Sequence, residues 1–227
     1  MDALLQALQL LFGENPELRE IIGVTLQMSF FSTSISALLG IPFGVWIGSN
    51  EFRGKPFVQR ITNTLMGLPP VVAGLIVFLI LSRSGPLGKL KLLYTVAAMV
   101  IAQVVLITPI ITGLTANIVS LRAPLIKETC LGLGISRFRQ MLYVIYECRI
   151  QFISTVLAGF GRAIAEVGAV TIAGGNIQYK TRVMTTAIVL QTNLGHFEFA
   201  VALGFVLLVI SFIVNSFVQR LSDRERA

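Results

Sequence analysis

An arginine and a glutamate, Arg162 and Glu166, stand four positions apart inside an apolar stretch of the chain. On a helix this spacing brings two opposite charges together as an ion pair. Arg162 follows Arg149, the last charged residue before the stretch, by 13 positions, which places it about 20 Å into a helical span. A charge at that depth costs at least about 2.5 kcal/mol in a bilayer, so Arg162 must face other helices, a water-filled cavity or a partner.

Two roles fit this pair. Arg162 can attract an anion while Glu166 restrains it, or the pair can be a buried brace that fixes the register of a helix. Small residues recur beside the pair at spacings of three, four and three positions: Ala158, Gly161, Ala165 and Gly168. This spacing predicts one helix face on which another backbone can approach closely.

Residues that could hold a metal or perform catalysis are scarce. Cys130, Cys148 and the one histidine, His196, form no metal-binding motif, so we expect no metal site, no catalytic residue and reduced thiols. The sequence has no GxxxxGK(S/T) phosphate loop, so we expect no bound cofactor, and any ATP would be bound by a partner subunit. A membrane-embedded transferase or protease would need clustered polar groups, and only Arg162 and Glu166 form a charged pair within a span.

The composition is that of a membrane protein. Hydrophobic residues make up 55% and charged residues 13% of the 227 positions, whereas soluble domains carry about 25% charged residues. The mean hydropathy is +0.82. The net charge of +7 comes from basic residues in short gaps between apolar runs. That distribution follows the positive-inside rule, so we expect contact with membrane lipid and no binding of nucleic acid.

Five apolar stretches are long enough to cross a bilayer, which takes about 20 helical residues. They are Ile21–Gly48, Ile61–Leu81, Leu93–Val119, Ile150–Ala173 and Phe197–Phe217. With the N-terminus outside, eleven Lys and Arg residues fall on the inner side and six on the outer side, which favours that orientation. We therefore expect an all-α integral membrane protein with a membrane domain over 21–219, an N-terminal interfacial segment over 1–20 and a cytosolic tail over 220–227.

The longest inner loop, residues 120–149, is predicted to fold into two short helices with a glycine hinge. Pro124 suits a helix start, Gly132 and Gly134 interrupt the helix, and Ser136 can cap a second one. Such a pair would form a compact amphipathic knob on the cytosolic face.

This loop resembles the coupling motif of ABC importer permeases, Glu-Ala-Ala-x-x-x-Gly followed later by Ile-x-Leu-Pro. Glu128 matches its glutamate and Gly134 its glycine, while Thr129 and Cys130 replace the two alanines. The tail departs from the motif, since it has valine, tyrosine and glutamate where isoleucine, leucine and proline would stand. The resemblance implies that a cytosolic ATPase docks here, on Glu128, Thr129, Cys130, Gly132, Gly134, Ser136 and Arg137.

The following segment, residues 157–176, resembles the permeases of the molybdate and tungstate family, which carry a similar Arg-Ala-x-x-Glu-x-Gly-Ala sequence. Residues 67–74 and 82–88 are similar to two further segments of that family. Val167, the Gly-Gly-Asn ending at Asn176 and residues 181–186 look more like the tungstate branch.

The resemblance implies an ABC importer permease core of five transmembrane helices with a cytosolic coupling helix, in the plasma (inner) membrane of a prokaryote. It also implies a homodimer, two cytosolic ABC ATPase subunits and an extracytoplasmic substrate-binding protein. The expected cargo is tungstate, with molybdate or sulfate as alternatives. A membrane subunit with a structural or sensory role and no transport activity is the alternative outside this class.

The outer loop, residues 174–196, contains an apolar run from Met184 to Gln191. We expect a short helix there, which either closes the outer mouth as a re-entrant segment or packs against the bundle, and packing is the preferred interpretation. His196 is expected at the interface rather than as a ligand.

Overall fold

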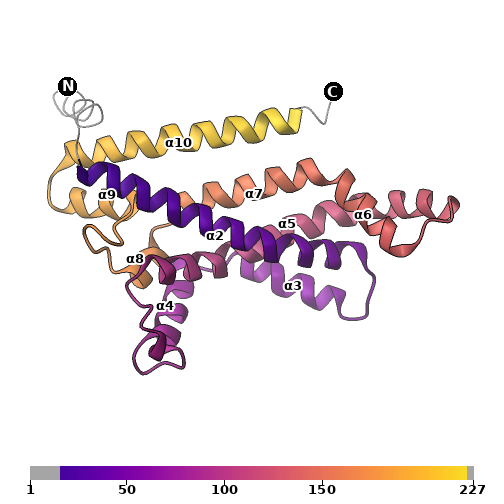
Figure 1. The fold of residues 1–227 in the computed structure, drawn as a ribbon, viewed down its shortest axis with the longest axis horizontal. Coiled ribbons are helices and arrows are strands. Elements are labelled where there is room, and N and C mark those ends of the chain that lie inside the picture. The colour runs from indigo at the N-terminus through magenta and orange to yellow at the C-terminus, as the bar shows by residue number, and fades with distance from the viewer. Residues whose placement is uncertain (1–15, 224–227) are drawn as a thin grey trace.

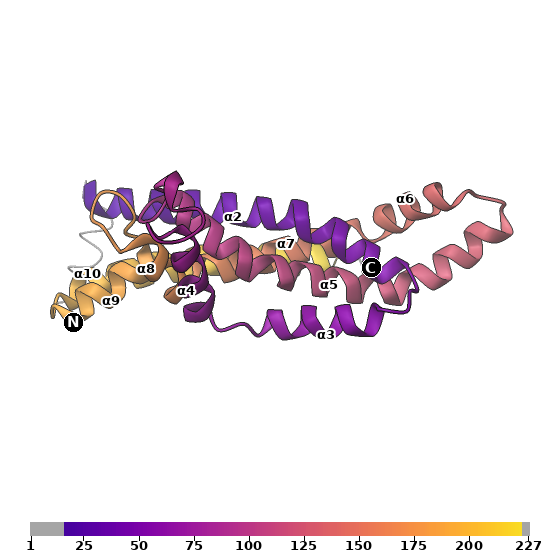
Figure 2. The same ribbon diagram turned by 90° about the horizontal axis from the view of Figure 1, so that it is seen from below.

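The computed structural model describes residues 16–223, and its regular elements are helices (Figure 1). The elements are α2 (Pro16–Ser49), α3 (Lys55–Met66), α4 (Pro70–Leu81), the 3-10 turn η1 (Gly88–Leu90), α5 (Val96–Gly132), α6 (Arg137–Glu147), α7 (Arg149–Ile164), α8 (Gly168–Gly174), α9 (Met184–Asn193) and α10 (Phe197–Asp223). Helices α2, α5, α7 and α10 run along the long axis of an elongated bundle, and α6 projects beyond one end (Figures 1 and 2).

Three helices of the described part, α2, α5 and α10, are each long and apolar enough to cross a membrane. Two bent pairs, α3 with α4 and α6 with α7, would raise this number to five if each pair forms one span. The expectation of an all-helical membrane protein is confirmed. Helix α2 begins at Pro16, so residues 16–20 belong to it, whereas the rest of the predicted interfacial segment and residues 224–227 of the tail lie outside the described residues.

Helices α2 and α5 pack closely along a seam of three glycines, Gly40, Gly44 and Gly48. A Cβ atom at Gly44 would lie 2.6 Å from the carbonyl oxygen of Thr112, and one at Gly48 would lie 2.7 Å from that of Ala116. Only residues without a side chain allow such close contact between two helix backbones. Sequence analysis missed this seam, although its spacing of four residues is a recognisable helix-packing pattern.

The second predicted span, Ile61–Leu81, is not one straight helix. Its two parts, α3 and α4, meet at an angle of 97°. The break falls at Gly67–Pro69, and α4 then begins at Pro70. Because Pro69 and Pro70 lack backbone N–H groups and restrict the residues before them, they turn an expected bend into a break. The start of α4 is then held against α8, since a Cβ at Gly74 would lie 2.7 Å from the Cα of Ala169.

The third predicted span was expected to end at Val119, with a separate helix beginning at Pro124. Helix α5 instead continues through Pro109 and Pro124 to Gly132, over 37 residues. A proline removes one backbone hydrogen bond and can be tolerated within a long helix, so Pro124 does not mark a helix start here. The inner loop is therefore a direct extension of the bundle.

Candidate functional site

The fourth predicted span, Ile150–Ala173, is broken at the residues expected to do chemistry. Helix α7 ends at Ile164, and α8 begins at Gly168 after a turn of three residues. The prediction that Arg162 and Glu166 lie on one continuous helix is therefore wrong. The pair still forms, because the turn brings a carboxylate oxygen of Glu166 to 3.6 Å from Nη2 of Arg162.

Glu166 is the buried member of the pair, with a side chain only 4% exposed. Its Oε1 accepts a hydrogen bond of 3.2 Å from the backbone N–H of Ala169, in the first turn of α8. Its backbone carbonyl accepts a bond of 2.7 Å from Oγ1 of Thr185 in α9. Glu166 thus joins α7, α8 and α9, as a structural brace does.

Arg162 occupies the opposite environment, since 45% of its side chain is exposed. The separation of 3.6 Å from Glu166 is longer than a normal hydrogen bond, so the carboxylate lowers the local positive charge without holding the guanidinium fully. The two residues of the pair thus differ in their surroundings. Glu166 has the contacts that a brace requires, and Arg162 presents its charge on an open face.

Gln103 fixes the end of α7 and was missed by sequence analysis. It is fully buried in α5, its Nε2 donates to the carbonyl oxygen of Ala163 at 2.8 Å, and its Oε1 accepts from Oγ of Ser32 at 2.6 Å. The same carbonyl also accepts a bond of 3.3 Å from the backbone N–H of Glu166, so the amide adds a second donor at the end of the helix. The signal in the sequence is an amide in the middle of an apolar run, where a buried polar group needs partners.

The predicted small-residue face does not pack within this chain. Ala158 and Ala165 are exposed, and a Cβ at Gly161 would meet nothing within 4 Å. Helix α7 contacts α5 through Gly159 instead, where a Cβ would lie 3.2 Å from side-chain atoms of Ile107 and Ile111. Gly168, beyond the break, packs on α4. Ala158, Gly161 and Ala165 therefore share an open face with Arg162.

The second candidate region is the hairpin formed by the end of α5 and by α6, which projects beyond the bundle (Figure 2). Gly134 turns the chain with φ +68°, a conformation that favours glycine. The backbone N–H of Ile135 donates to the carbonyl of Cys130 at 2.9 Å, which closes the end of α5. Gly132 was predicted to interrupt a helix, but it is the last residue of α5.

The remaining residues of the predicted docking surface lie on both sides of this turn. Ser136 precedes α6 as its N-cap residue, but its side chain makes no capping hydrogen bond. Gln140 supports the turn instead, since its Nε2 donates to the carbonyl of Ile135 at 2.8 Å. Glu128, Thr129 and Arg137 are exposed, whereas Cys130 is buried. The structure thus brings the predicted residues into one hairpin, with Cys130 on its inner side.

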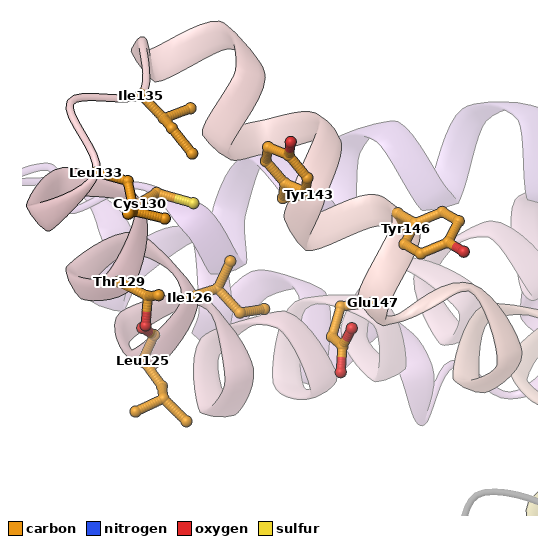
Figure 3. Close-up of a pocket in the computed structure, with 9 residues that line it drawn as sticks. All are labelled: Leu125, Ile126, Thr129, Cys130, Leu133, Ile135, Tyr143, Tyr146 and Glu147. Atoms are coloured by element: carbon orange, nitrogen blue, oxygen red, sulfur yellow. The ribbon is translucent and has the colours of Figure 1, made fainter.

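A pocket of about 380 Å³ opens between the two arms of the hairpin (Figure 3). Thr129 and Cys130 come from the α5 side and Tyr143, Tyr146 and Glu147 from the α6 side. The hairpin also exposes large apolar side chains, each more than two-thirds open to solvent: Leu125, Leu131, Leu133 and Phe138. Apolar surface of this extent on a projecting hairpin is typical of a protein-binding site.

The outer loop closes on the beginning of α2. Nη1 of Arg182 lies 3.0 Å from a carboxylate oxygen of Glu17, and Oγ1 of Thr181 donates to the carbonyl of Gly174 at 2.6 Å. Helix α9 packs into the core through Met184 and Ala187, which agrees with the preferred interpretation of this segment. Among residues 16–223, no group of three or more metal-binding side chains occurs, and His196 is exposed on this side.

Comparisons with known proteins agree with this architecture. The family model described as "Binding-protein-dependent transport system inner membrane component" matches residues 40–227. The tungstate uptake system permease protein TupB of Peptoclostridium acidaminophilum is 39% identical over 96% of this chain and 95% of its own length. TupB of Campylobacter jejuni is 38% identical over 97% of this chain and 92% of its own length. The molybdenum transport system permease protein ModB of Azotobacter vinelandii is 26% identical over 85% of this chain and 89% of its own length.

The fold recurs in a solved structure described as an amino acid ABC transporter with histidines. The two chains superpose with a TM-score of 0.64 over 92% of this chain and 94% of that one, at 17% sequence identity. At this identity the likeness shows the fold alone.

Proposed function

This chain belongs to the family of binding-protein-dependent transport system inner membrane components and is a transmembrane permease subunit for an oxyanion, and we propose that its cargo is tungstate. The two relatives named as tungstate permeases are 38% and 39% identical over nearly the whole chain, whereas the molybdenum permease is 26% identical. The protein is a multi-pass plasma-membrane protein. Molybdate and sulfate are the alternative cargoes.

The structural observation that supports an anion path is the exposed guanidinium of Arg162 inside an apolar helix. A charge about 20 Å into a span is costly against lipid, so this face belongs in a polar path or against a partner. In the proposed homodimer, the small residues of this face, Ala158, Gly161 and Ala165, let a second copy approach closely. The two copies then enclose an anion path in which each contributes one arginine.

The geometry of the pair suits transport better than tight binding. A fully paired arginine would not attract an anion, and an unopposed one in a low-dielectric path would hold it too strongly to release it. The carboxylate of Glu166 lies 3.6 Å from the guanidinium, so it reduces the attraction and leaves nitrogen atoms available to the passing anion. Arg162 would be a transient contact for the anion.

The hairpin of α5 and α6 is the proposed docking site for a cytosolic ATPase, which would bind and hydrolyse the ATP. Its exposed apolar side chains offer contact area, and the exposed polar residues Glu128, Thr129, Ser136 and Arg137 offer specific contacts. An extracytoplasmic binding protein would deliver the anion on the opposite side. Both partners are proposed from the family to which the chain belongs. A separate ATPase is also needed because the sequence of this chain has no phosphate loop.

The test is affinity purification of the tagged chain in mild detergent, with mass spectrometry of the proteins that accompany it. We expect an ABC ATPase and a binding protein. Uptake of labelled tungstate by the reconstituted complex should then be inhibited most by unlabelled tungstate, less by molybdate and least by sulfate, at equal concentrations. Absence of an ATPase would contradict the transport mechanism, whereas a different order of inhibition would contradict only the cargo.

A further inference from the structure

A cavity of about 490 Å³ lies where the end of α2 meets the end of α5 and the start of α6. It is separate from the pocket in Figure 3, which lies between the two arms of the hairpin. Its polar lining includes Ser49, Asn50, Lys127 and Arg137. Each of its eight lining residues is neutral or cationic, so no carboxylate competes for an incoming anion.

Two cationic side chains face this space from different helices. Nζ of Lys127 donates to the backbone carbonyl of Ser49, which fixes the ammonium group at the end of α2. Arg137 is exposed at the first position of α6 and makes no ion pair with any described residue. Two cations from different helices, neither of them in an ion pair with a described residue, are a suitable arrangement for binding a small anion.

Neutral hydrogen-bond donors complete the lining. The first turn of α6 lines the cavity, and it carries neither a side-chain cap nor an acidic residue. Its N–H groups and its helix dipole therefore favour a negative charge here.

The aromatic residues beside the cavity indicate its depth in the membrane. Trp46 stacks with Phe43 at 5.7 Å and with Phe52 at 4.8 Å, and Nδ2 of Asn50 donates to the carbonyl of Trp46 at 2.9 Å. Tryptophan is enriched at the level of the lipid head groups. The cavity, one helical turn further along α2, therefore lies at the surface that the distribution of basic residues predicts to be cytosolic.

We propose that this cavity binds an anionic phosphate group, held by Lys127, Arg137 and the first turn of α6. The phosphate can come from the head group of an anionic phospholipid or from free phosphate. Phe138 and Met141 also line the cavity and would contact the apolar part of a lipid. The bound group would connect α2 directly to the hairpin.

Trp46 is the one tryptophan of the chain, and its carbonyl is bonded to the side chain of the lining residue Asn50, so its fluorescence is a probe placed next to this cavity. The purified full-length protein, stripped of lipid in neutral detergent, is titrated with short-chain phosphatidylglycerol, short-chain phosphatidylcholine and inorganic phosphate. We expect a saturable change with phosphatidylglycerol or with phosphate. Saturation by phosphatidylglycerol alone identifies a lipid head group as the source, and saturation by phosphate identifies the free ion as sufficient.

Two variants test the lining, and one serves as a control. Lys127→Gln keeps a donor for the Ser49 carbonyl but removes the charge, and Arg137→Gln removes the charge of an exposed side chain, so both should remain folded. We expect the Kd to rise about tenfold for each of these two variants. Arg122→Gln, an exposed arginine of α5 outside the cavity, should leave the Kd unchanged. Equal response to phosphatidylcholine, or the same Kd in all variants, would overturn the proposal.

Discussion

Nε2 of Gln103 donates a hydrogen bond of 2.8 Å to the carbonyl oxygen of Ala163, a residue 60 positions further along the chain. The same side chain accepts a bond of 2.6 Å from Ser32, so one amide connects α2, α5 and the end of α7. The turn that begins two residues later carries Glu166 and positions Arg162. The geometry of the proposed anion path therefore depends on a residue that lies outside it.

Replacing Gln103 with leucine should destabilise the protein and disturb the turn. The change removes two buried hydrogen bonds worth about 1–3 kcal/mol together, although the Ala163 carbonyl still accepts from the Glu166 N–H and the Ser32 hydroxyl still donates to the Ser29 carbonyl. Thermal unfolding in detergent should show a lower Tm, and tungstate uptake should fall. Gln151→Leu is the matched control, because the side-chain oxygen of Gln151 is buried without a hydrogen bond to lose. A similar loss of stability in both variants would refute the special role of Gln103.

The two members of the charged pair should differ in their effect on transport. Glu166→Ala removes the bond to the Ala169 N–H and should lower the free energy of unfolding by about 1–3 kcal/mol. Arg162→Ala leaves the buried Glu166 carboxylate without its cation, so it should also lower the free energy of unfolding by about 1–3 kcal/mol, while tungstate uptake by the folded protein falls at least tenfold. Unfolding and uptake measured on the same preparations check both outcomes. Near-normal uptake by Arg162→Ala would remove this residue from the path.

The glycine seam should not tolerate even one added carbon atom. In Gly44→Ala the new Cβ would lie 2.6 Å from the Thr112 carbonyl oxygen, and the resulting shift of α2 away from α5 should cost about 1–3 kcal/mol. Gly23→Ala is a control on the same helix, since a Cβ there meets nothing within 4 Å. Thermal unfolding should distinguish the two variants. Equal Tm values would mean that the seam can widen without penalty.

Two glycines of the hairpin, Gly134 and Gly132, should also differ in how well they tolerate an added side chain. Gly134→Ala places a side chain on a backbone with φ +68°, which costs about 1–2 kcal/mol and should open the turn. Gly132→Ala, in a helical position with open space around it, should be nearly neutral. The readout is the amount of ATPase that co-purifies with the tagged chain, which should fall only for Gly134→Ala. Glu128→Ala should have a smaller effect, because its side chain is exposed and leaves the turn intact.

Local features of the chain were predictable, and contacts distant in sequence were not. The Arg162–Glu166 pair and the turn at Gly134 follow from spacing and from the conformational freedom of glycine. Hydropathy located the apolar stretches but cannot report whether a helix is continuous, so the break after Ile164 was missed. The same limit applies to Pro124, since its effect depends on what surrounds the helix. The partner of Gln103 is set by the tertiary packing of three helices.

Helix α5 has a mechanical consequence because it is uninterrupted from Val96 to Gly132. Its 37 residues form a rod about 55 Å long, one end of which lies in the hairpin while the other reaches the far side of the bundle. The glycine seam clamps α2 along this rod, so the two helices should rotate as a single lever. A displacement applied to the hairpin then tilts the opposite end in the reverse direction about the seam. We therefore expect the inner and outer ends of the subunit to move together.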